Sequence, residues 1–581
     1  MRTVSTDVVV VGGGATGAGV VRDLAMRGYA AVLVERADLG QGTTGRFHGL
    51  LHSGGRYVVS DPTSAAECAR ENAIVTRINA DAVEATGGYF VTTPGDDPGF
   101  ADQFLAAASA TGVPAREIPV REALRCEPGL NPAITRAIEV RDGAVDGWRL
   151  VWGAAGSAIE YGASVLTYHR LTKVVVRDGA VVGVECHDRL RDEPVRIDCS
   201  FVINCAGAWA GEVAGLAGCA DVEVVAGRGV MIAMGHRLVN RVINRCVYPT
   251  DGDILVPAHT VCIIGTTDVR DDDPDHLAVP PEEVQQLLDS GEALVPGFRR
   301  ARAVHAWAGA RPLIRDARVA ESDTRHMSRG LAILDHLERD GLRGLLTIAG
   351  GKLTTYRLMA ELVVDRMCAQ LGETRACRTA DEVVPAAASG TNHLVTSRLA
   401  RREADRLDDQ LVCECELVTR SMLVRALAGE SPDPVGAASP AGPLGIASRT
   451  GGPPTGAFAR EPSGSGSRPG ESASAGAPGQ AVGGRRARGA PSLDDVRRQL
   501  RLGMGPCQGG FCSLRAAGIA CGTGHADPAR ATALLRRFLG NRWIGLWPIL
   551  YGDQVRQTAL DAWIGSTLGV APLPADEEVV L

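Results

Sequence analysis

The stretch 7-DVVVVGGGATGAGVVRDLAMRGYAAVLVER-36 decides the fold of this chain. A valine run leads into glycines, a helical pattern follows, and a second apolar run ends at Glu35. Gly12, Gly14 and Gly17 form G-x-G-x-x-G at the junction of the predicted strand and helix. The acidic residue stands about twenty positions further on, as the dinucleotide-binding fingerprint requires. The stretch therefore predicts a Rossmann-type unit that binds a dinucleotide.

Each part of this motif has a physical task at a pyrophosphate. The first glycine allows the tight turn, and the second lets the backbone approach the phosphates at the positive end of the helix. The carboxylate accepts hydrogen bonds from the ribose hydroxyls. The glycines alone would also suit an ordinary βα turn, and the motif does not distinguish FAD from NAD. Its place near the start of the chain, several hundred residues before the next candidate domain, favours a tightly held flavin.

The composition fits a multidomain protein and argues against several other classes. The chain has 581 residues, enough for more than one hydrophobic core, and its formal net charge of −7 argues against nucleic-acid binding. Fifteen cysteines in a chain of this length do not indicate a secreted disulfide framework. No signal peptide and no run of about 20 apolar residues is visible. We therefore expect a reducing, cytoplasmic compartment, where paired cysteines bind metal more often than they cross-link a fold.

One long interruption of ordered structure is expected. Short strands and helices alternate from residue 37 to about 390, with a clear hairpin at 172–186 around Asp178-Gly179. Residues 431–490 consist mainly of Gly, Pro, Ser and Ala, and they cannot bury enough apolar surface to offset their chain entropy. We expect this insert to be disordered. Order is expected to resume at Ser492, as the N-cap of a helix.

Three stretches combine positive charge with glycines, which let a backbone come close to a ligand. They are 43-TTGRFHGLLHSGGRY-57, 308-AGARPLI-314 and 349-AGGKLTTYR-357. Arginine offers a planar fork and lysine a point charge, so together these stretches suit an anionic substrate, whereas each cation alone would suit an ordinary surface. Two histidines in the first stretch can move protons near neutral pH, although a lone histidine is usually structural. The candidate residues are Arg56, Arg311, Lys352, Arg357, His48 and His52.

Four cysteines late in the chain have the spacing of a metal centre. Cys413 and Cys415 are separated by one glutamate, and Cys507 and Cys512 follow as C-x4-C. Four thiolates suit an iron–sulfur cluster or zinc, and zinc more often uses C-x2-C pairs. Buried structural cysteines are the third possibility. A one-electron carrier beside a flavin makes chemical sense, so we interpret the four as ligands of an iron–sulfur cluster, with structural zinc as the alternative.

The order of the motifs resembles one known family. "VVGGGATGAG", "TTGRFHGLLHSGGRY", "VINRCVYPTDGDILVP", "IIGTTD", "GARPL", "AGGKLTTYRLMAE" and "LVCECE…GMGPCQGGFC" occur in that order. The chain is similar to the large catalytic subunits of bacterial anaerobic glycerol-3-phosphate dehydrogenase, within the D-amino-acid-oxidase-like FAD oxidoreductases. The late cysteines resemble those of the bacterioferritin-associated-ferredoxin-like [2Fe–2S] domain. The resemblance covers nearly the whole chain except 431–490.

The resemblance implies an α/β fold in four parts. A D-amino-acid-oxidase-like FAD-binding domain of Rossmann type is expected to interleave with a mixed-sheet substrate domain over residues 1–395. A small helical [2Fe–2S] domain is expected at 405–430 and 491–525, separated by the insert 431–490. A C-terminal helical tail is expected over 526–581, and its aromatic cluster, "RWIGLWPILYG" at 542–552, is a candidate docking site for other chains of a complex.

The resemblance also implies an activity and a set of functional residues. Such enzymes oxidise sn-glycerol 3-phosphate to dihydroxyacetone phosphate, and a hydride passes from substrate C2 to FAD. Arg56, Tyr57, Arg311 and Lys352 are implied to hold the substrate, and His52, Arg311 and Lys352 to serve catalysis, with His52 as proton acceptor. The implied FAD-binding residues are Gly12, Gly14, Gly17, Glu35, Thr44, Gly207, Gly350, Gly351 and Thr354. The implied metal ligands are Cys413, Cys415, Cys507 and Cys512.

Electrons are expected to pass through the cluster and partner subunits to quinone. The chain would then be one member of a hetero-oligomeric complex, peripheral on the inner face of the cell membrane, with no nucleic-acid partner. Two departures concern the site: Phe47 stands where the resemblance leads us to expect asparagine, and Arg228-Gly229-Val230 offers no pocket histidine. The alternatives are an amine or amino-acid oxidase of the same fold, and a non-catalytic Fe–S redox partner.

Overall fold

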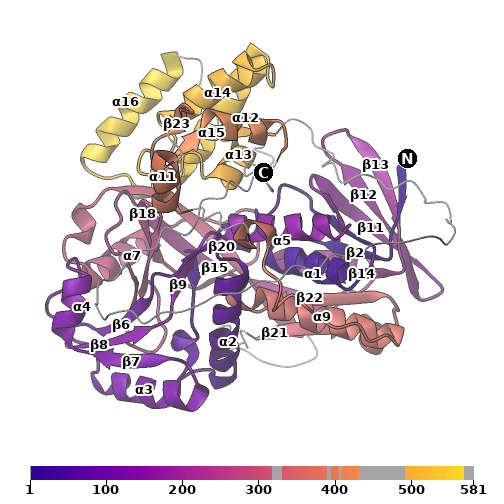
Figure 1. The fold of residues 1–581 in the computed structure, drawn as a ribbon, viewed down its shortest axis with the longest axis horizontal. Helices are drawn as coiled ribbons and strands as arrows, with labels where there is room; N and C mark the ends of the chain where they lie inside the picture. Colours follow the sequence, from indigo (N-terminus) through magenta and orange to yellow (C-terminus); the bar gives the residue numbers. More distant parts are fainter. Residues whose placement is uncertain (1, 317–329, 389–393, 405–407, 431–490, 568–581) are drawn as a thin grey trace, which may run out of the picture.

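The computed structural model describes residues 2–316, 330–388, 394–404, 408–430 and 491–567. A Rossmann-type half and a mixed-sheet half lie side by side, and the C-terminal helices lie at one end of the mixed-sheet half (Figure 1). The predicted disordered insert lies outside the described residues. Within the described part of the chain, none of the helices has the length and apolar character needed to span a membrane.

The first half is built on a six-stranded sheet whose strands are parallel except for β21 at one edge. Its order, β10-β3-β2-β14-β22-β21, places the glycine turn after β2 at the carboxyl edge of the sheet. The predicted strand–turn–helix–strand of residues 7–36 is therefore confirmed. The strands are β10 (Ser164–Leu166), β3 (Ala31–Val34), β2 (Val8–Val11), β14 (Phe201–Asn204), β22 (Leu345–Gly350) and β21 (Leu331–Asp335).

Both faces of this sheet are covered, which explains the unbroken valine run. Val8 and Val10 belong to a core with helices α1, α5 and α9, whereas Val9 and Val11 belong to a second core with a four-stranded sheet. A strand buried on both faces has no polar position. The predicted hairpin forms β11 and β12, joined by Asp178 and Gly179 with φ of 52° and 68°. The covering elements are α1 (Ala15–Met26), α5 (Gly147–Glu160), α9 (Tyr356–Leu371), α6 (Ala210–Gly215), β1 (Arg2–Ser5), β13 (Glu193–Asp198), β12 (Ala180–Asp188) and β11 (His169–Arg177).

The second half is a mixed sheet of nine strands, in agreement with the predicted substrate domain. Its order is β19-β15-β18-β17-β16-β6-β8-β7, and β20 pairs along β15 from the other side. The long β15–β20 ladder carries Arg311 opposite Gly227, at the border with the first half. The strands are β19 (Val269–Asp271), β15 (Val222–Met234), β18 (Val261–Gly265), β17 (Ile254–Ala258), β16 (Val242–Arg245), β6 (Gly88–Thr92), β8 (Arg136–Val140), β7 (Ala115–Ile118) and β20 (Ala303–Asp316).

The remaining elements are short or lie on the outside of the two halves. A three-stranded sheet, β4-β9-β5, joins the first half to the second. These elements are β4 (Leu50–Leu51), β9 (Gly143–Val145), β5 (Val83–Glu84), α2 (Pro62–Ile78), α3 (Gly99–Thr111), α4 (Val120–Cys126), α7 (Pro281–Leu294), α8 (His336–Asp340), α10 (Pro385–Ala388), α11 (Val395–Ala404) and α16 (Asp553–Thr567).

The cysteines lie in a small module with its own hydrophobic core. Ser492 caps its second helix and shares a capping box with Asp495, so the predicted N-cap is confirmed. The core extends past residue 525, because Leu535 and Phe538 of α15 belong to it. The elements are β23 (Leu411–Cys413), β24 (Val418–Thr419), α12 (Arg420–Leu427), α13 (Leu493–Leu500), α14 (Cys512–Gly522) and α15 (Pro528–Leu546).

Much of the predicted docking segment at 542–552 packs on its own chain. Trp543 and Ile549 are 4% and 1% exposed, and both belong to the core of the mixed sheet. Gly545 lies so close to His305 that a Cβ there would fall 1.9 Å from the ring. Trp547, by contrast, is 56% exposed. The tail therefore anchors the cysteine module to the substrate domain, and of its two tryptophans only Trp547 faces outward.

Trp543→Ala should lower the free energy of unfolding by about 3–5 kcal/mol, because it empties a large buried volume. Trp547→Ala is the matched control, and it should change stability by no more than about 0.5 kcal/mol. Urea unfolding of both variants measures the difference. Equal effects of the two substitutions would contradict this placement of the tail.

Candidate active site and four-cysteine centre

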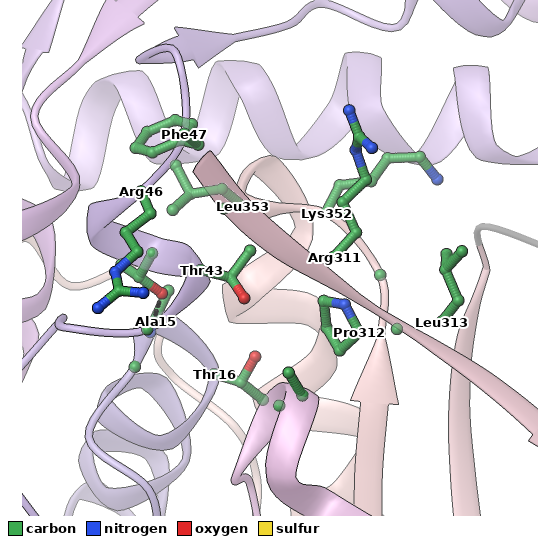
Figure 2. Close-up of a pocket in the computed structure, with 18 of the residues that line it drawn as sticks. Ala15, Thr16, Thr43, Arg46, Phe47, Arg311, Pro312, Leu313, Lys352 and Leu353 are labelled. Carbon is green, nitrogen blue, oxygen red and sulfur yellow. Dashed lines mark hydrogen bonds between the residues drawn. The ribbon is translucent and has the colours of Figure 1, made fainter. Parts of the chain in front are cut away.

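One large cavity, of about 1820 Å³, lies between the two halves. The carboxyl ends of β2, β3, β14 and β22 supply one wall and β20 supplies part of the other. Open α/β sheets bind their ligands at this edge, where the strand order reverses. Figure 2 shows the residues at the helix end, such as Ala15 and Thr16, on one side and Arg311 with Lys352 on another.

The glycine turn is built for close approach. Gly12 has φ of 107° and its missing Cβ would lie 2.6 Å from the Cys205 carbonyl oxygen. Gly14 is the N-cap of α1, and Thr44 Oγ1 accepts a hydrogen bond of 3.0 Å from the Ala15 N–H at that helix end. Gly12, Gly14 and Thr44 all line the cavity. The positive end of α1 therefore opens on the cavity, as an anion site requires.

Gly17 has a different task from the one the sequence suggested. It does not line the cavity, and a Cβ there would lie 1.9 Å from the Gly12 carbonyl oxygen. Its role is to let α1 pack tightly against the turn after β2, which is the usual role of the third glycine. Gly17 therefore shapes the turn through backbone packing and does not face the cavity.

Glu35 stands at the end of β3 on the cavity wall. Its carboxylate accepts hydrogen bonds from the Gly13 N–H at 2.7 Å and the Ala37 N–H at 2.9 Å. Burial raises the pKa of Glu35 above its usual range, although these two backbone donors oppose the shift. The acid is thus fixed in orientation by backbone donors, where a ribose would approach.

The other predicted flavin contacts line the same cavity. Gly207, Gly350 and Gly351 line the cavity, and their backbone φ angles are 59°, 76° and 68°. Residues other than glycine rarely adopt such values. Thr354 also lines the cavity, and its hydroxyl is buried without a hydrogen-bond partner among the described residues. Because buried hydroxyls are normally satisfied, this orphan fits a site whose partner is a bound group.

Three cations predicted from separate stretches meet at the cavity. Arg56 donates to both oxygens of Asp253 at 2.8 Å, and Arg311 donates to Asp268 Oδ1 at 2.9 Å. Lys352 Nζ lies 3.0 Å from Ser64 Oγ and 4.7 Å from the centre of the Tyr57 ring.

All four of the predicted substrate-binding residues, Tyr57 included, line the cavity. The paired carboxylates hold the arginines in place, so the cationic region is oriented before a ligand arrives.

Two histidines share this region. His52 is 9% exposed, packs edge-on to the Tyr57 ring at 5.1 Å, and has no hydrogen-bond partner for Nδ1 among the described residues. Burial, aided by the positive charge of Lys352, holds the pKa of His52 well below its usual value. Burial likewise lowers the pKa of His48 to about 3. Both rings are therefore uncharged at neutral pH, and His52 has a nitrogen available to a ligand.

Arg357 is the one predicted cation that the structure places elsewhere. It is 4% exposed, does not line the cavity, and forms a two-pronged ion pair with Glu71 at 2.7 and 2.8 Å. A third bond of 2.6 Å reaches Glu361. It therefore serves the packing of α9 against α2. Arg357 lies at the start of a helix, where successive side chains point in different directions. The spacing of the sequence therefore could not show that Lys352 faces the cavity and Arg357 does not.

Arg46 is a cavity residue that the sequence reasoning passed over. It lies in the first glycine-rich stretch and lines the cavity near Ala15 (Figure 2). Burial lowers its pKa from the usual arginine value. A cation beside the N-terminus of α1 adds to the positive potential there. Its neighbour Phe47, the departure from the expected asparagine, also lines the cavity and packs against the first core.

Residues 228–230 supply no histidine to the cavity, and the arginine among them is paired with carboxylates. Arg228 is buried and forms ion pairs with Glu283 at 2.6 Å and Asp271 at 3.2 Å. Gly229 lines the cavity, and a Cβ there would lie 2.8 Å from Arg311 Nη2. The absence of a side chain at 229 therefore makes room for the Arg311 guanidinium.

The four predicted cysteines come together in two pairs. The Cys413 thiolate accepts a hydrogen bond from Cys512, which lowers the pKa of Cys413 to about 6 and raises the pKa of Cys512. Cys415 interacts with Cys507, and burial raises the pKa of Cys415 to about 11. Among the described residues, no three of these four sulfurs lie within 4.8 Å of one another. A tetrahedral zinc site, with Zn–S bonds near 2.3 Å, would hold its sulfurs only about 3.8 Å apart.

Comparison with known proteins agrees with this fold and site. The pattern of the FAD dependent oxidoreductase family matches residues 7–357. The A subunit of anaerobic glycerol-3-phosphate dehydrogenase from Escherichia coli is 39% identical over 96% of this chain and 96% of its own length. The protein of the same name from Haemophilus influenzae is 37% identical over 100% and 96%.

A solved structure shares the fold. The glycerol-3-phosphate dehydrogenase of Bacillus halodurans, complexed with FAD, is 24% identical with a TM-score of 0.52, covering 69% of this chain and 71% of that one. The fold and the family pattern define a FAD dependent oxidoreductase. Within that class, the chain belongs to the family of anaerobic glycerol-3-phosphate dehydrogenase A subunits.

Gly17→Ala should remove bound flavin and lower stability, because its Cβ would collide with the Gly12 carbonyl at 1.9 Å. Gly156→Ala is the matched control: it lies inside α5, and a Cβ there meets nothing within 4 Å. The control should be neutral or stabilising by up to about 1 kcal/mol. Flavin absorbance per chain and urea unfolding measure both effects. Full flavin content in Gly17→Ala would contradict the packing role.

Proposed function

We propose that this protein oxidises sn-glycerol 3-phosphate to dihydroxyacetone phosphate and passes the electrons through a [2Fe–2S] cluster to quinone. The observation that carries the proposal is the convergence of Arg56, Arg311 and Lys352 on the dinucleotide cavity. A phosphate monoester needs more positive charge than a carboxylate does. The cation content therefore favours a phosphorylated substrate over the amino acids that an amine oxidase of this fold would take.

In this proposal, four residues of the cavity bind the substrate and a fifth accepts a proton. Arg311 and Lys352 hold the phosphate, and Arg56 with Tyr57 orients the hydroxyls. His52 is the proposed acceptor of the proton of the C2 hydroxyl, because it lines the cavity beside Tyr57 and its Nδ1 has no partner among the described residues. FAD supplies the acceptor for the hydride from C2. Positive charge around the hydroxyl also stabilises the oxyanion that develops as the proton leaves.

The proposed FAD contacts follow the walls of the cavity. Gly12, Gly14 and the end of α1 receive the pyrophosphate, and Glu35 receives a ribose. Gly207, Gly350 and Gly351 allow the flavin ring to approach the backbone, and Thr354 supplies a hydroxyl. Thr44 shapes the turn through its bond to the Ala15 N–H.

A [2Fe–2S] cluster fits the four cysteines better than zinc does. Two pairs of sulfurs, with no three close together among the described residues, suit two metal ions more readily than one tetrahedral ion. Cys413, Cys415, Cys507 and Cys512 are thus the proposed ligands.

The proposed electron acceptor is reached through partner subunits. Phe511 and Leu514, beside the ligand Cys512, are 70% and 56% exposed, and large exposed apolar side chains favour an interface. The names of the relatives, as A subunits, support a complex of several chains. We propose that this complex is peripheral on the cytoplasmic face of the membrane. Trp547 remains a second candidate contact.

Anaerobic addition of glycerol 3-phosphate should bleach the flavin, and amino acids should leave it oxidised. Arg311→Met should raise KM about tenfold to a hundredfold with FAD still bound, since a charge-assisted bond contributes about 1.5–3 kcal/mol. The control is Arg116→Met, whose side chain is 67% exposed and does not line the cavity. A KM in Arg311→Met equal to that of Arg116→Met would remove Arg311 from the substrate site.

The double substitution Cys413→Ser with Cys415→Ser should abolish the cluster's visible absorbance and leave single-turnover bleaching nearly unchanged. Hydride transfer depends on contact within the cavity, which these cysteines do not line. Reduction of quinone should collapse, whereas an artificial dye that oxidises the flavin directly should still be reduced. Undiminished quinone reduction would instead indicate structural zinc.

A further inference from the structure

A chain of buried ion pairs joins the cysteine module to the flavin half. Glu416, next to the proposed ligand Cys415, is fully buried. Its Oε2 accepts from Arg501 Nε at 3.2 Å and lies 3.1 Å from His259 Nδ1. Arg501 Nη1 in turn donates to Asp146 Oδ2 at 3.1 Å. We call these four residues, Glu416, Arg501, Asp146 and His259, the interdomain strap.

The strap ends at the wall of the flavin cavity. Asp146 is the N-cap of α5, where its other oxygen accepts from the Trp148 and Arg149 N–H groups at 3.0 and 3.1 Å. The next residue, Gly147, packs against the flavin-facing turn: a Cβ there would lie 2.5 Å from the Thr44 carbonyl oxygen and 2.9 Å from the Phe47 ring. The strap thus reaches the turn that holds the end of α1.

At its other end the strap is directly attached to Cys415. A Cβ on Gly505 would lie 2.2 Å from Cys415 Cβ, 2.9 Å from its Sγ and 3.4 Å from Thr260 Oγ1. Thr260 and His259 belong to the turn between β17 and β18 of the substrate half. Cys415 therefore lies at the junction of the cysteine module with the substrate half. Cys512, by contrast, begins a helix whose first turn exposes Leu514.

Two features indicate that this network serves orientation more than stability. Buried ion pairs often contribute no more than apolar residues of similar volume would, because desolvation opposes their attraction. In addition, Arg501 closes helix α13 with φ of 61°, a left-handed conformation at a position where glycine is usual. A strained arginine persists where its side chain has a task that glycine lacks.

We propose that the interdomain strap positions Cys415 as the entry point for electrons travelling from the flavin to the cluster. The inference rests on the proposed function. One electron leaves the reduced flavin and reduces the cluster, and the second follows once the acceptor has reoxidised the cluster. Because the rate of electron transfer falls steeply with distance, a fixed separation between the two centres sets this rate. The strap residues are positioning residues and take no part in substrate oxidation.

The test compares Arg501→Met with Arg515→Met in the purified, flavin- and cluster-loaded chain. Arg515 is the matched control because it lies in the same module and forms an exposed ion pair with Glu414, between the two cysteines, at 2.5 Å. Rapid mixing with glycerol 3-phosphate follows flavin bleaching and cluster reduction separately. In Arg501→Met, bleaching should stay within about twofold of wild type, and cluster reduction should slow about tenfold or more. Arg515→Met should leave both unchanged.

Two further variants separate positioning from folding. Arg501→Gly relieves the left-handed backbone, which offsets part of the cost of leaving the buried Glu416 and Asp146 without the arginine, and cluster reduction should slow as it does in Arg501→Met. Arg501→Lys keeps the charge and should restore part of the rate. If cluster reduction in Arg501→Gly is as fast as in wild type, the arginine serves only to end helix α13, and the proposal is overturned.

A readout without the cluster completes the test. In apoprotein, amide hydrogen exchange at 411–419 and 143–149 should accelerate in Arg501→Met and not in Arg515→Met, because the module is held less firmly. Unchanged exchange would overturn the positioning role. The amide-exchange measurement does not depend on the proposed function. If glycerol 3-phosphate fails to bleach even the wild-type chain, the proposed function is wrong. Amide exchange then still decides whether the strap holds the cysteine module to the flavin half.

Discussion

The close approach of helix α1 to strand β2 is the contact on which the rest of the structure depends. Gly17 permits it, because its hydrogen takes the place where any Cβ would meet the Gly12 carbonyl at 1.9 Å. This contact directs the positive end of α1 to the carboxyl edge of the sheet. The turn at Thr44 closes over that end, Gly147 packs on the turn, and Asp146 links it to the cysteine module. One packing contact therefore positions both the cofactor end of the cavity and the path away from it.

The opposite end of the cavity is governed by charge pairing. Asp253 and Asp268 hold Arg56 and Arg311 before a substrate arrives, so binding does not have to order these long side chains. The two carboxylates also reduce the net positive potential that an anion would meet. The paired arginines attract an anion less strongly, but their positions are fixed. Fixed positions suit a reaction in which substrate C2 must be held against the flavin ring. His52, the proposed proton acceptor, adds no charge there, because burial holds its pKa well below its usual value.

The sequence was sufficient for features that are local or that follow a known motif. The valine run and glycines of 7–36 predicted the sheet and its turn, and the cysteine spacing predicted four sulfurs that the structure brings together. Contacts between segments that lie far apart in the sequence could not be predicted in this way. Nothing in 349-AGGKLTTYR-357 tells Lys352, at the end of a strand, from Arg357, whose partner Glu71 is far away in sequence. The burial of Trp543 and the pairing of Glu416 with Arg501 also depend on contacts between segments that no spacing reveals.

In the proposed function, one substrate loads two redox centres in the same chain. Anaerobic titration of the purified chain with glycerol 3-phosphate measures it most directly, by counting electrons taken up at full reduction. We expect roughly three electrons per chain, two at the flavin and one at a [2Fe–2S] cluster, and the absorbance change of the cluster should be missing when the cysteines are replaced. An uptake of only about two electrons by a chain that holds its full metal content would contradict it.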